Sequence, residues 1–241
     1  RLYQSYDMAP ETLKNIVWDG LDVDEQQGII TSELQLEPYH SIEVRGAAKL
    51  QINNGIQPST LLTTNQIYSL MYEGGIKADV RDSVLYIATS NQLPLDDIMI
   101  EFAITSPNLR QLTVYGASKI ETAENQVLAQ PNFALDLNGA AEADLLLNVQ
   151  TLVIDAKGAS KLELEGQADD VHITIAGAGE VEAEDFLVQT MHINCAGASK
   201  AEVNVARELW AQAAGASKIS YNGNPTIKQK LAVGGSLIIR D

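Results

Sequence analysis

Two histidines are the residues of this sequence whose types and spacing best suit chemistry. His172 and His192 each lie five residues before the glycine of a Gly-Ala motif, Gly177 and Gly197. If these motifs mark equivalent positions of stacked strands, the two imidazoles lie about 5 Å apart on one outward face. Together with Asp155, which lies on the same face three residues before its own glycine, they could hold a Zn²⁺ or similar ion.

An aromatic side chain takes the same position before the next motif. Trp210 lies five residues before Gly215, and Asn194 lies three residues before Gly197. An outward indole beside polar groups could stack on a sugar ring, because its face is apolar and its N–H can donate a hydrogen bond. The sequence therefore marks one ligand-contact surface, made of Trp210, His172, His192 and Asn194. The alternative is a solvated polar ladder that carries one partly covered aromatic ring.

Acidic residues recur five positions after the glycines and could form a Ca²⁺-binding column, since Ca²⁺ takes several oxygen ligands. The column consists of Glu121, Asp144, Glu163, Glu182 and Glu202. Neither the DxDxDG loop of an EF-hand nor a calcium-binding nonapeptide repeat occurs, and lysines interleave with the column. The pattern therefore favours a solvated face whose carboxylates pair with lysine.

Catalytic signatures are missing from the sequence. It contains no G-x-S-x-G, Walker A, H-E-x-x-H or G-x-G-x-x-G motif. A Ser-Lys pair recurs at four motifs, which suits a structural role and not a unique nucleophile; its serines are Ser118, Ser160, Ser199 and Ser217. Cys195 falls at an inward position of its strand, so we expect a buried, unreactive thiol. We expect a protein that is not an enzyme and needs no cofactor.

Composition limits the partners of the chain. It has 241 residues, and the 45% that are hydrophobic can build a sizeable core. The formal net charge of −16 opposes binding to nucleic acid or to anionic lipid. The single cysteine excludes an intrachain disulfide framework. No apolar run approaches the roughly 20 residues of a membrane-spanning helix. No signal peptide follows Arg1, so we expect any export signal to lie outside this sequence.

An internal repeat must position these side chains. A Gly-Ala motif, called a corner below, begins every 18 to 23 residues at Gly116, Gly139, Gly158, Gly177, Gly197 and Gly215. This period suits one turn of a β-solenoid and is too short for helical repeats. Apolar residues alternate before and after each glycine, as in strands. We predict an all-β, single-stranded, right-handed parallel β-helix-like solenoid with rungs of about 19 residues, stacked around one core.

The first half of the sequence is less regular. Gly46 begins an isolated earlier corner, and strand-like alternation occurs at 42–44, 50–52, 61–64, 67–72, 76–80, 84–88 and 98–104. We expect residues 1–31 to form a cap or extra strands, with a short helix that could start at Pro10. Residues 32–110 are expected to be an irregular β region, and residues 111–241 the regular repeats. No linker separates these parts, which predicts a single elongated β domain.

The order of the corners resembles that of one protein family. The serial corners and the segments Ser41–Ile52 and Ala214–Pro225 are similar to the putative auto-transporter adhesin, head GIN domain family of Bacteroidetes-type bacteria. The family's Tyr-x-Gly-x-Pro end is matched by Tyr221, Gly223 and Pro225. The resemblance covers roughly residues 32–241. It implies a β-helix-like fold, export to the periplasm, outer membrane or cell surface, and no catalytic residues.

Three functions are compatible with these patterns. The first is a non-enzymatic, extracytoplasmic adhesion, matrix-binding or scaffolding module whose partner is a cell-surface glycan or protein, and which could form a homo-oligomer through its ends. The second is a carbohydrate-active β-helix enzyme, a polysaccharide lyase or glycoside hydrolase, which a groove with convergent Asp and Arg would support. The third is a structural spacer with no saturable ligand. The missing catalytic motifs favour the first.

Overall fold

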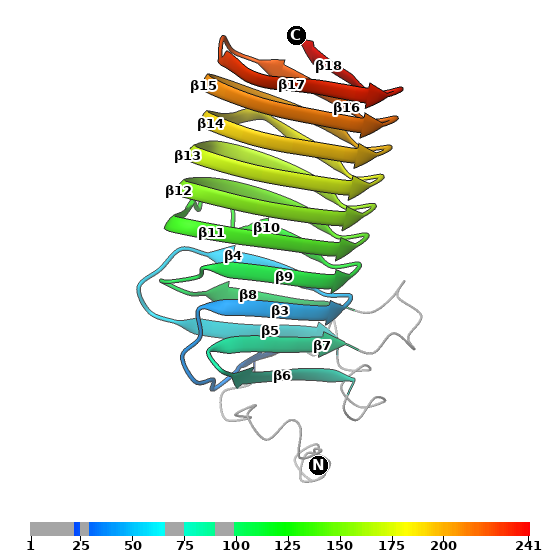
Figure 1. The fold of residues 1–241 in the computed structure, drawn as a ribbon. Coiled ribbons are helices and arrows are strands. Elements are labelled where there is room, and N and C mark those ends of the chain that lie inside the picture. The colour runs from blue at the N-terminus through cyan, green and yellow to red at the C-terminus, as the bar shows by residue number, and fades with distance from the viewer. Residues whose placement is uncertain (1–21, 25–28, 66–74, 90–98) are drawn as a thin grey trace, which may run out of the picture.

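The chain folds as an all-β solenoid, as the alternation of apolar residues predicts (Figure 1). The computed structural model describes residues 22–24, 29–65, 75–89 and 99–241. Within these ranges it has no helix, and so none long and apolar enough to cross a membrane. Its strands join into one 18-stranded hydrogen-bonded sheet that winds around an apolar core. The helix expected from Pro10 and the strand expected at 67–72 lie outside the described residues.

Long parallel strands form the regular rungs of the second half. They are β11 (Leu128–Gly139), β12 (Glu142–Gly158), β13 (Lys161–Gly177), β14 (Glu180–Gly197) and β15 (Lys200–Gly215). All five strands end on a corner glycine, and β12 to β15 each begin three residues after the corner glycine that precedes them. Gly158 pairs with Gly139 on one side and with Gly177 on the other, which confirms the predicted alignment of the corners.

Alternate side chains of these strands fill the interior. In β12, for example, Leu152, Ile154 and Ala156 are at most 1% exposed. Removing a large aliphatic side chain from water stabilises the fold by about 1.5–3 kcal/mol, so every rung adds several such contributions. No rung could hold them alone, because its inward side chains are covered only by those of its neighbours. Cys195 lies in this interior at 0% exposure, as predicted.

Glycine makes the corners possible. The six predicted corner glycines all adopt a positive φ; at Gly177 the value is 122°. The amide of Ala178 donates a hydrogen bond of 2.8 Å to the carbonyl oxygen of Gly158, which ties each corner to the one before. The serine two residues after a corner glycine points inward, and Ser217 donates hydrogen bonds to the carbonyls of Cys195 and Ala214. The serine of the Ser-Lys pair therefore has a structural role at the corner.

In the first half, the order of strands in the stack differs from their order in the chain. The rung that carries Gly46 consists of β3 (Ser41–Gly46) and β4 (Lys49–Asn53). It lies between two rungs that come later in the chain (Figure 1). These are β7 (Val84–Thr89) with β8 (Ile100–Thr105), and β9 (Gln111–Gly116) with β10 (Lys119–Thr122). The isolated corner at Gly46 thus stacks directly against Gly116.

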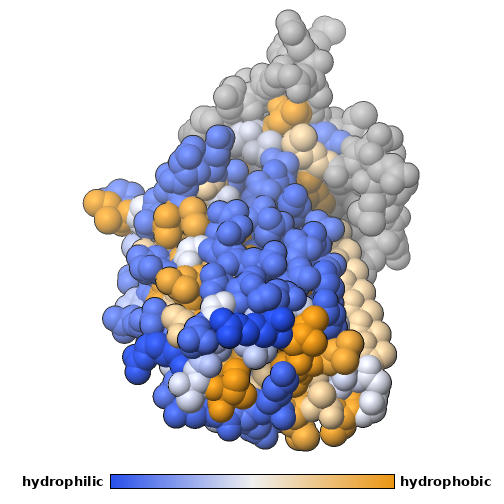
Figure 2. Space-filling view, turned by 90° about the horizontal axis from the view of Figure 1, so that it is seen from above, coloured by the Kyte–Doolittle hydropathy of each residue, from blue (hydrophilic) through white to orange (hydrophobic). Residues whose placement is uncertain are grey.

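The two ends of the stack are built differently. Antiparallel strands close the N-terminal end: β1 (Asp22–Asp24), β2 (Ile29–Glu33), β5 (Ser59–Asn65) and β6 (Ile76–Arg81). At the other end lie β16 (Lys218–Asn222), β17 (Thr226–Gly234) and β18 (Leu237–Arg240). Strand β17 is exposed along its whole length. Figure 2 looks onto this end, where apolar and charged side chains lie side by side; the exposed apolar ones include Leu231, Val233 and Leu237.

Candidate functional site

A column of three rings runs along the outward face of β13, β14 and β15. The centroids of the His172 and His192 rings are 4.6 Å apart, with an angle of 4° between the ring planes. His192 and Trp210 continue the stack, with centroids 4.1 Å apart and an angle of 10°. The strands pair in register at all three positions, so the predicted stacking is confirmed. Parallel strands bring such rings to contact distance without further support.

The stack limits the surface of Trp210 that a ligand can contact. One face of the Trp210 ring is covered by His192, so a sugar cannot stack on that face. On its other side, Trp210 pairs with Gln229 of the last rung, and both residues line the hollow beside the rings. The His192 ring has a ring on each side, so its edge is the part left for a ligand. The structure shows a half-buried indole at the end of a stack of rings, which matches the partly covered aromatic ring of the alternative given by the sequence.

Amide and hydroxyl groups surround the rings. A shallow hollow of about 140 Å³ is lined by His172, Thr174, His192, Asn194, Trp210, Gln212 and Gln229. Asn194 lies where the sequence placed it, in register with Thr174 and Gln212. The sequence reasoning missed Thr174, Gln212 and Gln229 as members of this surface. Their regular spacing before the corners was a signal that could have found Thr174 and Gln212.

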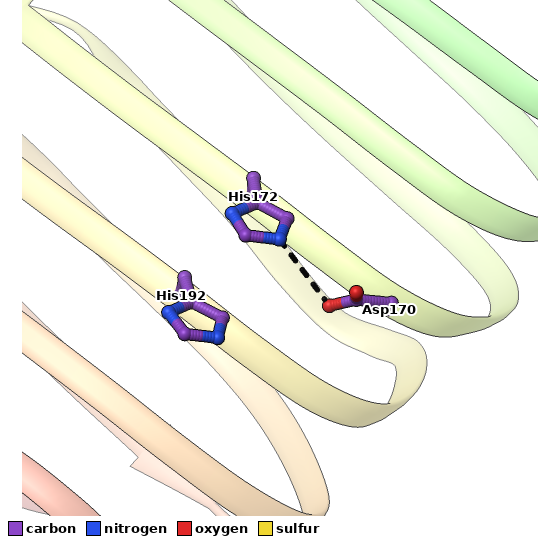
Figure 3. A group of neighbouring side chains, drawn as sticks. All are labelled: Asp170, His172 and His192. Atoms are coloured by element: carbon purple, nitrogen blue, oxygen red, sulfur yellow. Dashed lines mark ion pairs between the residues drawn. The ribbon is translucent and has the colours of Figure 1, made fainter.

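The carboxylate that joins the histidines is Asp170. Its Oδ1 lies 3.5 Å from Nε2 of His172, as Figure 3 shows. Asp155, the carboxylate chosen from the sequence, lies on the neighbouring rung in register with Thr174 and accepts a hydrogen bond of 2.7 Å from Lys157. Asp170 precedes His172 by two residues on β13, which places both side chains on one face. This i, i+2 spacing is visible in the sequence and is the signal that could have found it.

The acidic column pairs with lysines. Nζ of Lys200 lies 3.1 Å from carboxylate oxygens of both Glu180 and Glu202. The hydrogen bond with Glu180, and to a smaller extent the one with Glu202, raises the pKa of Lys200 above its ordinary value. Lys161 contacts Glu182 in the same manner, at 3.3 Å. This face is therefore the solvated, lysine-paired surface that the interleaved charges predicted.

Two further hollows lie away from the rings, and they differ in the carboxylates that line them. One of about 390 Å³, at the bends of the regular rungs, is lined by Gln130, Gln150, Gln167 and Gln189, with Asp169 as its single carboxylate. The other, of about 310 Å³, contains Glu33 and Glu37. No arginine lines any of these three hollows of the described chain, so none brings an arginine and carboxylates together.

Solved structures of bacterial proteins share this architecture. A putative adhesin from Bacteroides fragilis is 18% identical, with a TM-score of 0.78 over 88% of this chain and 97% of that one. A putative lipid binding protein from Parabacteroides distasonis is 15% identical, with a TM-score of 0.69 over 89% of this chain and 97% of that one. A putative adhesin from Parabacteroides merdae is 18% identical, with a TM-score of 0.60 over 88% and 96%. None of these descriptions names an enzyme.

A comparison with curated proteins finds no match. One family model, described as "Putative auto-transporter adhesin, head GIN domain", matches residues 38–225. The matched range holds the rung of Gly46, all the regular corners and the Tyr-x-Gly-x-Pro end, which are the parts that carried the resemblance in the sequence. Because the match spans well over half of the chain, this protein belongs to the family of the putative auto-transporter adhesin, head GIN domain.

Proposed function

We propose that the chain is a non-enzymatic adhesion module that acts outside the cytoplasm and binds a neutral cell-surface glycan on the outer face of β13–β15. The observation that carries this proposal is the continuous stack of His172, His192 and Trp210 with amide groups beside it. The family description and the adhesin names of two similar structures support an adhesive role.

The chemistry of the face suits a carbohydrate. The ring edges supply apolar contact, while the indole N–H and the amides of Asn194 and Gln212 supply hydrogen-bond donors and acceptors. A sugar presents C–H and O–H groups side by side and can use both kinds of contact. The net charge of −16 opposes an anionic polysaccharide, so a neutral glycan is the better ligand.

The role of a carbohydrate-active enzyme has less support. A glycosidase needs two carboxyl groups placed on either side of the scissile bond. The hollow beside the rings has no carboxylate in its lining, and the larger hollow at the bends has one. The third hollow has Glu33 and Glu37, but both come from one short segment of the chain, and no arginine of the described residues lines it. A shallow, open face suits binding to a long ligand, because a solenoid presents the same groups over several rungs.

Affinity electrophoresis against a panel of neutral and acidic polysaccharides tests the proposal. Wild-type protein is expected to be retarded by at least one neutral polysaccharide, with no release of reducing ends or unsaturated products. Trp210→Ala should lose the retardation. Val153→Ala should keep it, because Val153 occupies the same column one rung before His172 and carries no ring. Retardation that survives Trp210→Ala would contradict the assigned surface; absence of any retardation would favour a protein partner or a spacer.

A further inference from the structure

Three potential metal ligands meet on the outer face of the solenoid. Asp170 and His172 lie two residues apart on β13, and His192 is the direct partner of His172 on β14. One ligand atom from each of the three side chains lies within 4.8 Å of the others. In Figure 3 the two imidazoles lie one beside the other in the same orientation, and Asp170 lies on the side to which a ring nitrogen of His172 points.

The distances are close to those of a tetrahedral site. Zinc binds imidazole nitrogen and carboxylate oxygen at about 2.0–2.2 Å, which places neighbouring ligand atoms of a tetrahedron about 3.4 Å apart. Oδ1 of Asp170 and Nε2 of His172 are 3.5 Å apart and meet this requirement. His192 must tilt its ring out of the stack to complete the set. The half-exposed side chains of Asp170 and His172 leave a fourth position open to water.

The carboxylate of Asp170 has no competing partner among the described residues. Its Oδ1 is buried without a hydrogen bond, although it faces an imidazole nitrogen. No lysine or arginine of the described chain forms an ion pair with it, whereas Lys157 neutralises Asp155 and Lys228 neutralises Glu208 on the same face. A cation at Asp170 would therefore gain an oxygen ligand that nothing else in the described structure uses.

We propose that Asp170, His172 and His192 bind one divalent transition-metal ion, for which Zn²⁺ is the appropriate probe. Two imidazoles and one carboxylate suit Zn²⁺ and its neighbours in the first transition row, whereas Ca²⁺ prefers an all-oxygen site. A site with three protein ligands and an open fourth position can also accept a donor atom from another molecule. This inference does not depend on glycan binding, because the ion alone should occupy the site.

Calorimetric titration of the full chain with ZnCl₂, with no glycan present, tests the site. Wild-type protein is expected to bind one Zn²⁺ per chain, and CaCl₂ is expected not to compete. His172→Gln and His192→Gln should abolish this binding. Asp170→Asn should weaken it by at least the roughly 10–100-fold that loss of an outer-shell partner costs, because it replaces an anionic ligand oxygen with a neutral amide. His40→Gln is the matched control, because His40 lies outside the cluster and hydrogen-bonds Ser41.

A spectroscopic readout separates ligation from unspecific binding to an acidic surface. His192 stacks on Trp210, so a tilt of its ring on metal binding should change the fluorescence of Trp210 in a Trp18→Phe background. The change should saturate at one equivalent of Zn²⁺ and be absent in His192→Gln. Circular dichroism establishes that each variant is folded. Lack of Zn²⁺ binding by the wild type, equal binding by His172→Gln, or displacement by Ca²⁺ would each overturn the proposal.

Discussion

The carbonyl oxygen of Gly158 fills the space that a Cβ atom at Gly177 would need, because successive corners are stacked backbone on backbone. The φ of 122° at Gly177 is also one that residues with a side chain rarely adopt. Both obstacles recur along the column of corner glycines, from Gly116 to Gly215. The glycine recurs in the sequence because each corner needs the same close contact between backbones.

Replacing a corner glycine should destabilise the fold strongly. Gly177→Ala is expected to lower the free energy of unfolding by about 1–3 kcal/mol from the backbone conformation alone, with a further loss from displacing Gly158. Gly179→Ser is the control, because Gly179 has no positive φ and the equivalent positions of other corners hold Ser160 and Ser199. Its added Cβ would meet Cγ2 of Ile175 at 2.9 Å, so this variant reports the cost of crowding alone. Urea denaturation measures both variants. Equal losses in the two would show that crowding, and not the corner conformation, sets the cost.

Exchanging a paired lysine and glutamate on the lysine-paired face should leave the stability of the protein nearly unchanged, whereas changing only one of them should lower it. Glu180→Lys places four lysines in one column with Lys161, Lys200 and Lys218, which is destabilising because like charges then lie on paired strands. We expect the melting temperature to fall by about 2–4 °C, and by less in high salt. Adding Lys200→Glu to Glu180→Lys should restore most of the loss. A melting temperature that does not respond to the swap would contradict the pairing.

The thiol of Cys195 should be inert and should make stability sensitive to alkali. Burial raises its pKa to about 11, against a smaller lowering by a hydrogen bond with Ser199. The unfolded chain releases this proton at a lower pH, so the unfolded state binds fewer protons over the window from about 9 to 11. Stability must then fall as the pH rises through this window, by at most about 1.4 kcal/mol per pH unit.

Cys195→Ala isolates that contribution, because Ala213 occupies the equivalent position of the next rung. Lysines and tyrosines titrate in both proteins, so the difference between the two pH profiles belongs to the thiol. Thiol-reactive dyes at a pH of about 8, near the ordinary pKa of a free thiol, should label the wild type only after denaturation. Labelling of the folded protein at the rate of the unfolded chain would refute a buried thiol.

Lys230 is expected to oppose association at the C-terminal end of the stack. Lys230 pairs with the inward-facing Ala211, and its Nζ lies 5.9 Å from the centroid of the Tyr221 ring. An inward charge on an edge strand opposes pairing with another chain. Lys230→Leu is therefore expected to self-associate at lower concentration than the wild type in sedimentation velocity. Lys157→Leu, on the flat outer face, should not self-associate more than the wild type. If Lys230→Leu also associates no more than the wild type, other residues prevent association at this end.

The regular rungs could be predicted because the corner glycines mark equivalent positions of successive rungs. The strands pair without a shift over the eight residues that end on each of these glycines, so counting back from the glycines is enough to place His172, His192 and Trp210 together. The path of the first half could not be predicted in this way. Alternation identifies the buried face of a strand but not its neighbour, and nothing local indicates that Gly46 stacks against Gly116.

The site itself was only partly predictable. Distances along the chain placed the three rings in one column and anticipated a partly covered indole, but the nearly parallel orientation of the rings depends on side-chain rotamers, which spacing does not determine. Asp170 belongs to no acidic column, because threonines occupy the paired positions of both neighbouring rungs, and a search for columns passes over it. Asp155 was chosen without regard to Lys157, which lies two residues later. Lys157 donates a hydrogen bond to the carboxylate of Asp155.

The rung of β3 and β4 is clasped between strands that follow it in the chain (Figure 1). Under tension, the two ends of the molecule should therefore yield differently. Rungs at the C-terminal end can unwind singly, each releasing about 60 Å of extended chain for its roughly 19 residues. The clasped rung can leave only if hydrogen bonds on both of its sides break together. A module pulled from a surface would lengthen in steps from one end while the other end held.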